Sequence, residues 1–464
     1  MLLRYFYDRA LAQASYMVGC QSCGEAMIID PARDITPYLE AAQQEGLRIA
    51  HVTETHIHAD FVSGALELAV ATGARLYLSA EGGDDWTYRW ADDETVLLRD
   101  GDRIAFGGVR LDVLHTPGHT PEHLAFVLTD VAGADAPFGI FTGDCLFVGD
   151  MGRPDLLETA AGVVGSKEIG ARGQFANMQR LRAMPDYLQV FPGHGAGSAC
   201  GKALGALPSS TLGYEKRFNP AFQFDDEAAF VDWLLAEQPE TPPYFAQMKR
   251  VNRDGVMLLS NLSSLRQLDP VWLPGILDKG LLVIDARPLA AYAAGHIAGT
   301  VNIPQGDKFN TYAGYLINYT QPYYLIAEAD AMAEVARLLH AVGADRLDGY
   351  WTPESLHFDM MLPGVTPDTA APRINSGDAW LLDVRGQSEY DARHIAGAHH
   401  LPLPLLARHI DTLPREQPII VHCASGLRSQ IAASYLRARG FTDVTNLSGG
   451  IDGWRAARQA VVEG

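Results

Sequence analysis

The second half of the chain contains one pattern of residues twice, and this repeat limits the possible folds more than any other feature. The matching residues keep one offset of 98 positions. They are Asp285, Arg287, Tyr292, His296 and Pro304 in the first copy and Asp383, Arg385, Tyr390, His394 and Pro402 in the second. A period this long indicates a duplicated domain rather than a solenoid, whose repeats measure about 20 to 50 residues. Because apolar strands alternate with helices in both copies, each copy is predicted to be a parallel α/β domain.

The second copy contains a cysteine that the first copy lacks. An apolar strand expected over residues 419–422 leads to Cys423, and Arg428 follows in the turn before a helix expected over residues 430–439. A cysteine in this position lies among backbone N–H groups at the start of a helix, which stabilise a thiolate and bind anions. The corresponding stretch of the first copy, residues 323–330, has no cysteine. We therefore expect a nucleophile in the second copy and none in the first.

This loop resembles the sulfur-carrying loop of rhodanese domains. Four residues separate Cys423 from Arg428, as in rhodaneses, whereas the unrelated cysteine-dependent phosphatases have one residue more. The resemblance implies that Cys423 is a catalytic residue that carries sulfur as a persulfide and that Arg428 holds an anionic acceptor. It also implies an inactive rhodanese-like domain at residues 256–362 and an active rhodanese domain at residues 363–464.

Histidines and aspartates follow four apolar strands in the first half of the chain. The densest group comes directly after the strand expected over residues 49–53, and the others follow later strands. The residues concerned are His56, His58, Asp60, His119, Asp144 and His194. In α/β proteins the carboxyl ends of strands are where ligands bind, and a spacing of two places His56 and His58 on one side of an extended segment. Four strand ends that deliver such side chains to one rim predict a metal site.

The order of these motifs resembles the metallo-β-lactamase superfamily, which implies an αββα sandwich at residues 1–255. A dinuclear zinc hydrolase of this superfamily, such as glyoxalase II, has a histidine for its second metal where this chain has Phe61. Since a phenyl ring cannot coordinate a metal, we expect one ion per chain. The persulfide dioxygenase branch of the superfamily implies His56, His119 and Asp144 as the ligands of that ion.

The same resemblance assigns roles to residues around the metal. His58, Asp60 and His194 are expected to surround the ligands, as second-sphere groups, rather than bind the ion. Arg153 is expected to hold an anionic end of the substrate, with a structural salt bridge as the alternative. Cys200 matches a cysteine in a subgroup where a persulfide dioxygenase is fused to rhodanese domains, which implies a catalytic thiol. The alternative for Cys200 is a small buried apolar residue.

The cysteines indicate separate thiols. There are five of them, an odd number at scattered spacing, which argues against a disulfide framework. Cys20 and Cys23 form a CxxC pair, but a structural zinc site would need two more ligands, and no thioredoxin-like helix follows. We expect an ordinary hairpin there, with Cys20 near the metal site as the alternative.

Length and charge limit the remaining possibilities. At 464 residues the chain is long enough for about three domains. A formal charge of −20 argues against nucleic acid or an anionic membrane as a partner. No apolar run approaches the length of about 18 residues that a membrane span needs, and Arg4 and Asp8 oppose a signal peptide. A cytoplasmic enzyme is expected, assembled as a homo-oligomer, either a dimer or a tetramer.

As a whole the chain resembles bacterial sulfide-detoxifying fusions of a persulfide dioxygenase with an inactive and an active rhodanese domain. That resemblance implies one Fe(II) ion, bound by two histidines and a carboxylate with open positions. The implied substrates are the persulfide of a low-molecular-weight thiol and O₂, which give sulfite, and Cys423 then transfers sulfur to sulfite to form thiosulfate. Two alternatives stay open. A zinc thioester hydrolase of the glyoxalase II type would use similar ligands, and a non-catalytic sulfur-relay protein would need only Cys423.

Overall fold

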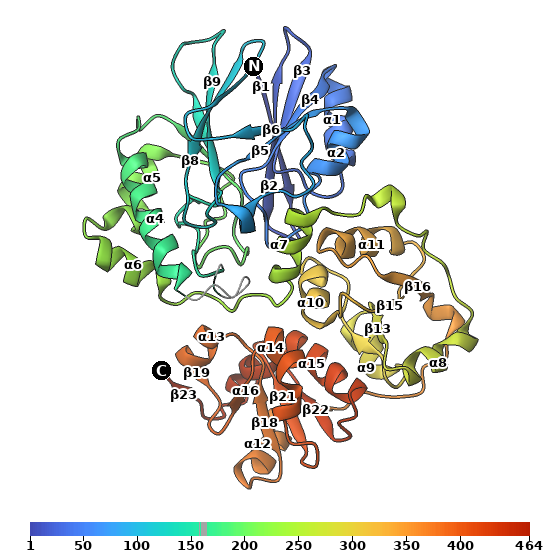
Figure 1. Cartoon of the computed structure of the whole chain (residues 1–464). Coiled ribbons are helices and arrows are strands. Elements are labelled where there is room, and N and C mark those ends of the chain that lie inside the picture. Colours follow the sequence, from blue (N-terminus) through green and yellow to red (C-terminus); the bar gives the residue numbers. More distant parts are fainter. Residues whose placement is uncertain (157, 159–164) are drawn as a thin grey trace. The chain divides into compact units, whose positions relative to one another are not determined.

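The structure is a computed structural model that describes residues 1–156, 158 and 165–464. The chain divides into two compact units (Figure 1). The first contains residues 1–262 and 341–343, and the second contains residues 263–340 and 344–464. Among the described residues, no helix combines the length and the apolar character needed to cross a membrane.

Two six-stranded sheets form the first unit, in the orders β1-β2-β3-β4-β5-β6 and β12-β11-β10-β9-β8-β7. The first sheet contains β1 (Leu2–Asp8), β2 (Gln13–Cys20), β3 (Glu25–Ile29), β4 (Arg48–Thr53), β5 (Arg75–Ser79) and β6 (Val96–Leu98). The second contains β7 (Arg103–Phe106), β8 (Val109–His115), β9 (Leu124–Asp130), β10 (Gly139–Gly143), β11 (Gln189–Pro192) and β12 (Ser210–Thr211). Strands β3, β4 and β5 are parallel neighbours. Helices α1 (Thr36–Glu45) and α2 (Ala65–Thr72) therefore make the crossovers between them.

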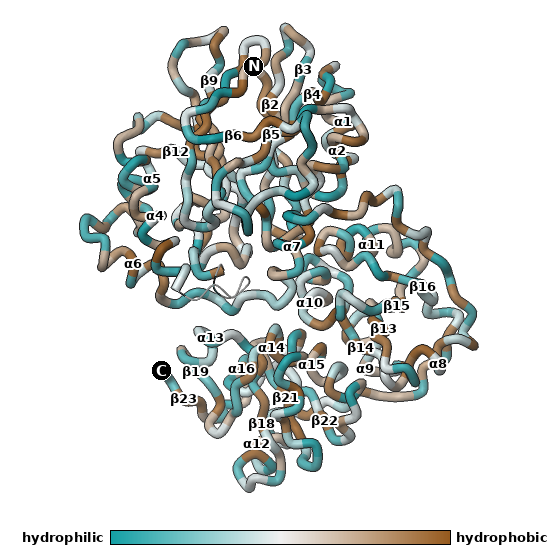
Figure 2. Tube along the Cα trace, viewed as in Figure 1, coloured by the Kyte–Doolittle hydropathy of each residue, from teal (hydrophilic) through white to brown (hydrophobic). Residues whose placement is uncertain are grey.

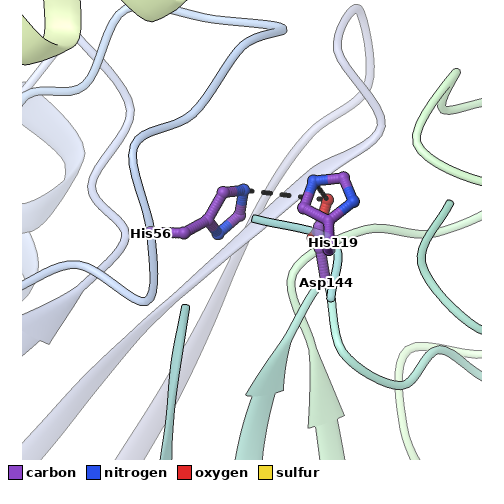
Figure 3. Close-up of side chains that lie close together, drawn as sticks. All are labelled: His56, His119 and Asp144. Atoms are coloured by element: carbon purple, nitrogen blue, oxygen red, sulfur yellow. Dashed lines mark ion pairs between the residues drawn. The ribbon is translucent and has the colours of Figure 1, made fainter. Parts of the chain in front are cut away.

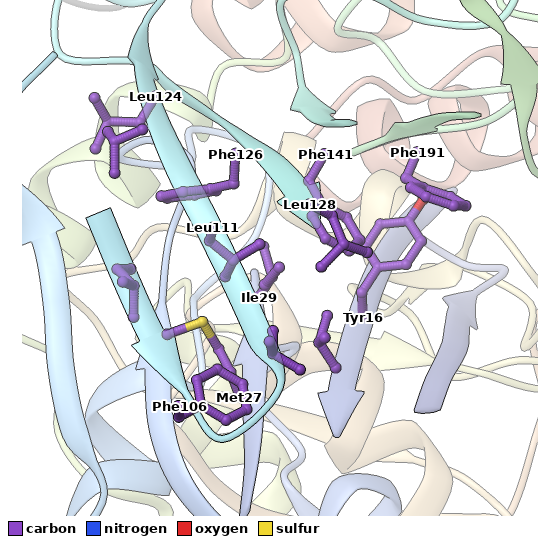
Figure 4. Packing of buried hydrophobic residues seen from close by; sticks show 14 of the residues in the cluster. Tyr16, Met27, Ile29, Phe106, Leu111, Leu124, Phe126, Leu128, Phe141 and Phe191 are labelled. Atoms are coloured by element: carbon purple, nitrogen blue, oxygen red, sulfur yellow. The ribbon is translucent and has the colours of Figure 1, made fainter. Parts of the chain in front are cut away.

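The core of the first unit lies between its two sheets. Strand β8 faces this core with every second residue. Val109, Leu111 and Val113 are buried, whereas the residues between them are only partly buried. The two-residue period of a strand requires this alternation. Inward-facing side chains of both sheets meet in one cluster (Figure 4). It includes Tyr16, Met27, Ile29, Phe106, Phe126 and Phe141. Removing a large apolar side chain of this kind from water contributes about 1.5 to 3 kcal/mol.

Helices cover the outer faces of both sheets. Helices α1 and α2 pack on the first sheet through a separate cluster that includes Tyr38 and Leu68. Helices α4 (Ser166–Arg182) and α6 (Glu227–Leu235) pack on the second sheet through a cluster that includes Met178 and Phe230. Helices α5 (Leu212–Phe218) and α7 (Phe245–Asp254) also belong to the unit. The predicted αββα sandwich is therefore confirmed.

The second unit contains two parallel sheets, one for each copy of the repeat. The first has the order β14-β13-β15-β16, from β13 (Leu282–Asp285), β14 (Val301–Asn302), β15 (Tyr323–Ile326) and β16 (Leu347–Trp351). The second has the order β17-β22-β21-β18-β20, from β17 (Gly364–Val365), β18 (Trp380–Asp383), β20 (His399–His400), β21 (Ile419–His422) and β22 (Val444–Leu447). Strands β19 (Arg393–His394) and β23 (Val462–Glu463) form a small antiparallel pair. The prediction of two parallel α/β domains is confirmed, and their boundaries at residues 255 and 362 stay a prediction.

Helices flank these sheets. Hydrophobic residues lie along the strands more than in the turns between them (Figure 2). The first domain has α8 (Leu273–Asp278), α9 (Leu289–Ala294), α10 (Phe309–Leu316) and α11 (Met332–Ala341). The second has α12 (Pro367–Asn375), α13 (Gln387–Ala392), α14 (Leu403–His409), α15 (Leu427–Ala438) and α16 (Gly450–Ala456). Helix α15 starts before the expected position 430, so Arg428 lies in its first turn. Gly426 precedes the helix with a φ of 112°, a conformation that glycine adopts without strain and that allows the earlier start.

Candidate metal centre

Four loops meet at one end of the first unit. His56 follows β4 of the first sheet, whereas His119, Asp144 and His194 follow β8, β10 and β11 of the second. Each of these residues is at most 2% exposed. The structure thus brings the metal-binding residue types expected from the sequence to one buried rim.

His56, His119 and Asp144 form a group able to hold a metal ion (Figure 3). One ligand atom from each residue lies within 4.8 Å of the other two. Nε2 of His119 is 3.4 Å from Oδ2 of Asp144, and Nε2 of His56 is 4.0 Å from the same oxygen. That carboxylate oxygen is buried and accepts no hydrogen bond, which is unusual in a protein interior. An unsatisfied anionic atom that faces two imidazoles fits a bound divalent cation.

Hydrogen bonds hold both ligand imidazoles with Nε2 toward that carboxylate. The Thr55 hydroxyl donates to Asp30 at 2.8 Å, so it accepts the Nδ1 proton of His56 at 2.9 Å. Nδ1 of His119 donates to the backbone carbonyl of Arg153 at 2.9 Å. Burial lowers the pKa of both histidines. Each imidazole is therefore neutral and keeps a lone pair on Nε2 for a metal.

His194 lies between two carboxylates. Its Nδ1 donates to Oδ1 of Asp144 at 2.8 Å, and its Nε2 donates to Oδ2 of Asp60 at 2.7 Å. Burial opposes the charge on this imidazole, but the two carboxylates raise its pKa well above the ordinary value. Burial also opposes the charge on Asp144, but His194 and His119 lower the pKa of that carboxyl group. A protonated His194 donates through both nitrogens and offers no lone pair to a metal.

A second group of metal-binding residue types lies beside the first. Asp60, His194 and Cys200 have one ligand atom each within 4.8 Å of one another, but the hydrogen-bonded nitrogens of His194 weaken this group as a metal site. His58 is turned toward Asp30, with Nε2 3.2 Å from Oδ1. Burial lowers the pKa of His58, yet Asp30 outweighs burial and raises it to about 9. Phe61 is fully buried, with its ring 4.4 Å from the His58 ring, and so contributes an apolar surface instead of a ligand.

Arg153 and Cys200 are both buried. The Arg153 guanidinium donates to both carboxylate oxygens of Asp155, at 2.7 and 2.6 Å, and to the carbonyl of Ala199 at 3.2 Å. This is the salt bridge that the sequence left as the alternative, and substrate binding by Arg153 stays a prediction. Cys200 is 2% exposed, and burial raises the pKa of its thiol well above the ordinary value. Its resting state is therefore the neutral thiol, and its catalytic role stays a prediction.

His123 was missed by the reasoning from sequence. Its Nε2 accepts from the backbone N–H of Asp144 at 3.0 Å, and its Nδ1 donates to the Thr116 hydroxyl at 2.7 Å. Burial lowers its pKa to about 3, which keeps it neutral. Gly143 makes the close approach possible, since its φ is +48° and a Cβ there would lie 2.6 Å from Nε2 of His123. A signal was present, because His123 follows closely after His119 in one His- and Pro-containing run.

The second candidate site is the loop after β21. Cys423 is 1% exposed, and its Sγ accepts from the backbone N–H of Gly426 at 3.1 Å and from the Ser429 hydroxyl at 3.4 Å. Both hydrogen bonds stabilise a thiolate. Arg428 pairs with both carboxylate oxygens of Glu389, at 2.6 and 2.8 Å. Sequence reasoning missed this partner because it lies 39 residues away in the chain.

Two family models match the chain. The model of the metallo-beta-lactamase superfamily matches residues 8–194. The model of the rhodanese-like domain matches twice, at residues 269–351 and 366–457. The two matches of the second model correspond to the two copies of the repeat.

Several known proteins resemble parts of the chain. A hydroxyacylglutathione hydrolase of Rhodospirillum rubrum is 34% identical over 180 residues, which are 39% of this chain and 60% of that protein. The mitochondrial persulfide dioxygenase ETHE1 of Homo sapiens is 32% identical over 163 residues, which are 35% of this chain and 59% of that protein. The chain thus spans less than two thirds of the length of both relatives. A crystal structure of a metallo-beta-lactamase from Staphylococcus aureus subsp. aureus COL is 46% identical, with a TM-score of 0.71, and covers 76% of this chain and 99% of its own.

Proposed function

The chain belongs to the metallo-beta-lactamase superfamily and carries two rhodanese-like domains, and from this premise we propose that it is a persulfide dioxygenase joined to a sulfurtransferase. Its substrates are the persulfide of a low-molecular-weight thiol and O₂. Persulfide, O₂ and water give the thiol and sulfite. Sulfite then takes one sulfur atom from a second persulfide, by way of the rhodanese domain, and leaves as thiosulfate.

One observation carries this proposal, namely that hydrogen bonds already occupy the second of the two groups of metal-binding residue types in the described part of the first unit. Phe61 contributes no ligand, and His194 is engaged by two carboxylates through both nitrogens. What is left is two histidines and one carboxylate, the set that holds Fe(II) with open positions in non-heme oxygenases. Fe(II) bound by His56, His119 and Asp144 would supply the activation of O₂.

The residues around this group would hold protons and exclude water. His194 keeps a proton between Asp60 and Asp144, which fixes the orientation of the ligand carboxylate. The burial of all three ligands limits the access of bulk water, so that charged groups interact more strongly than they would at the surface. Cys200 places a neutral thiol beside Asp60 and His194, where a persulfide substrate would pass.

Sulfur transfer would take place at Cys423. Its thiolate attacks the outer sulfur of a persulfide, the S–S bond breaks, and the low-molecular-weight thiol leaves as a thiolate. Sulfite then attacks the outer sulfur of the Cys423 persulfide, whose proton passes to solvent, and thiosulfate leaves as the Cys423 thiolate forms again. The hydrogen bonds from Gly426 and Ser429 stabilise that leaving thiolate, and the Arg428 guanidinium attracts the anionic sulfite.

A zinc-dependent thioester hydrolase is the second candidate. The hydroxyacylglutathione hydrolase relative favours it, since its 34% identity is no lower than the 32% of the persulfide dioxygenase. Zinc accepts the same ligand types. The metal and the reaction it supports must therefore separate the two candidates.

Reconstitution with each metal tests the proposal. The metal-free full-length protein is loaded anaerobically with either Fe(II) or Zn(II) and assayed with glutathione persulfide and with S-lactoylglutathione. We expect oxygen uptake with the persulfide from the iron form alone and no thioester hydrolysis above that of the free metals. Thioester hydrolysis by the zinc form, with no oxygen uptake by the iron form, would establish the hydrolase instead.

A further inference from the structure

The CxxC pair lies at the end of the first unit that is remote from the metal ligands. Cys20 ends β2 and pairs across the hairpin with Glu25, the first residue of β3. Glu25 in turn lies beside Arg48, the first residue of the parallel strand β4. The ligand His56 follows the opposite end of β4. The alternative that placed Cys20 near the metal site is therefore wrong, because the strand pairing carries it to the other end of the sheet.

The sulfur atoms of Cys20 and Cys23 both lie against one glycine of a neighbouring turn. This turn, between β7 and β8, contains Gly107 and Gly108. The backbone N–H of Gly108 donates to Sγ of Cys20 at 3.2 Å. A Cβ on Gly107 would lie 2.4 Å from Sγ of Cys20 and 2.7 Å from Sγ of Cys23. Both sulfurs therefore sit against a bare stretch of backbone that any side chain would fill.

The two thiols differ in charge and in access. Hydrogen bonds from the Ser22 hydroxyl and the Gly108 amide lower the pKa of Cys20 to about 6, which favours its thiolate. Partial desolvation and a hydrogen bond with Cys20 raise the pKa of Cys23. Cys20 is 4% exposed, whereas Cys23 is exposed to solvent. A thiolate held against a second thiol that solvent can reach is the arrangement of cysteines that undergo thiol–disulfide exchange.

We propose that Cys20 and Cys23 form a redox-active dithiol that exchanges with low-molecular-weight disulfides. The exposed Cys23 loses its proton to solvent and attacks one sulfur of the external disulfide, which releases one thiolate and leaves a mixed disulfide. The Cys20 thiolate then attacks Sγ of Cys23, and the second thiolate leaves. The pair loses two electrons and forms an internal disulfide, and the external disulfide gains them and becomes two thiols.

Equilibration of the full-length protein in glutathione redox buffers tests this reaction. After an acid quench and alkylation, peptide mass spectrometry should show a Cys20–Cys23 disulfide whose fraction follows the ratio of oxidised to reduced glutathione. Cys20→Ser should accumulate glutathione on Cys23, because no resolving thiolate remains. Cys23→Ser should resist modification, because Cys20 is shielded. Reduced cysteines in oxidised glutathione alone, or the same level of mixed disulfide in the natural protein as in Cys20→Ser, would overturn the proposal.

Two neighbouring glycines provide a pair of variants, of which only Gly107 has a positive φ, +52°. Gly107→Ala places a methyl group against both sulfurs and should lower the fraction of internal disulfide severalfold at a fixed redox ratio. Gly108→Ala keeps the donating N–H, and its added Cβ would meet nothing nearer than Ala132 at 3.5 Å, so it should behave as the natural protein. Equal metal content in both variants shows that the remote metal centre is intact. Equal disulfide fractions in the two variants would contradict the geometry on which the proposal rests.

Ser22→Ala tests the thiolate itself. Loss of the hydroxyl should raise the midpoint of the ultraviolet thiolate titration that is absent from Cys20→Ser. Since the hydroxyl stabilises the reduced form, its loss should also favour the internal disulfide at a given glutathione ratio. An unchanged titration and an unchanged disulfide fraction would show that Ser22 does not tune this pair and would count against the proposed exchange.

Discussion

The two rhodanese-like domains share a framework of polar contacts and differ in one loop. In both, the arginine of the repeat pairs with the aspartate two residues before it, and the tyrosine hydroxyl donates to a backbone carbonyl. The pairs are Arg287 with Asp285 at 2.6 Å and Arg385 with Asp383 at 2.5 Å, and Tyr292 with Thr300 at 2.7 Å and Tyr390 with Ala398 at 3.0 Å. The residues that recur in the sequence therefore stabilise each domain.

The difference lies at the end of the central strand. In the second domain β21 leads to Cys423, whose Sγ is surrounded by hydrogen-bond donors. In the first domain β15 leads to Ala327 and Glu328, which line a cavity of about 650 Å³ together with Arg287 and other residues. A carboxylate there cannot take up sulfur. Duplication has kept the contacts that hold the fold, whereas the chemistry depends on a loop that has changed.

The largest expected effect comes from replacing the nucleophile Cys423, which only the second domain contains. In the full-length Cys423→Ser protein, thiosulfate formation from glutathione persulfide and sulfite should fall to the non-enzymatic rate, since a hydroxyl cannot carry a persulfide. Persulfide-dependent oxygen uptake should stay close to that of the natural protein, with sulfite as the product. Residual enzymatic thiosulfate formation would show that a group outside the second domain also transfers sulfur and would break the comparison.

Removal of the framework aspartates should affect both domains alike. Asp285→Ala and Asp383→Ala each leave an arginine unpaired in a largely buried position and should destabilise the local domain by about 3 kcal/mol. Hydrogen exchange measured by mass spectrometry should show lost protection in β13 for the first variant and in β18 for the second. A clear loss in one domain only would mean that the two frameworks are not equivalent.

A smaller effect is expected from Arg428→Lys. Lysine cannot reproduce the two parallel hydrogen bonds to Glu389 or present the same planar group to sulfite. The KM for sulfite should rise by about tenfold, equivalent to about 1.4 kcal/mol, with little change in oxygen uptake. Arg439 directly follows the same helix, so Arg439→Lys is the matched control. It should change neither the KM for sulfite nor the oxygen uptake. A KM for sulfite that is equal in the two variants would remove Arg428 from the acceptor site.

The smallest expected effect is a loss of stability of the second domain at acidic pH. The pKa of Glu389 is lowered by Arg428, although burial opposes this. Because the folded-state pKa lies below the unfolded value, the pair stabilises the domain above the ordinary carboxyl pKa of 4.5 and loses this contribution as the pH falls through the lower folded value. The pair is partly exposed, so the contribution is about 1 kcal/mol or less. Glu389→Gln should remove this part of the acid sensitivity in α13, and an unchanged profile would show that the pair is not stabilising.

Sequence reasoning succeeded where the relevant signal is local and failed where it depends on distant residues. The strand ends that supply His56, His119 and Asp144 each carry their own apolar run and turn, so their meeting at one rim followed from the fold. The two carboxylates that hydrogen-bond to His194 come from other loops, and these contacts became visible only in the structure. Strand pairing places Cys20 at the end of the sheet remote from His56. A short CxxC motif does not encode this pairing.

Oxygen consumption by the iron-loaded protein is the most direct test of the central claim. With one Fe(II) per full-length chain and glutathione persulfide as the only substrate, an oxygen electrode should record uptake of one O₂ per persulfide oxidised to sulfite. Asp144→Ala should lose both the bound iron and the uptake, and should still form thiosulfate when sulfite is added with persulfide. Two zinc ions per chain in the purified protein, or no persulfide-dependent uptake by the iron form, would contradict the claim.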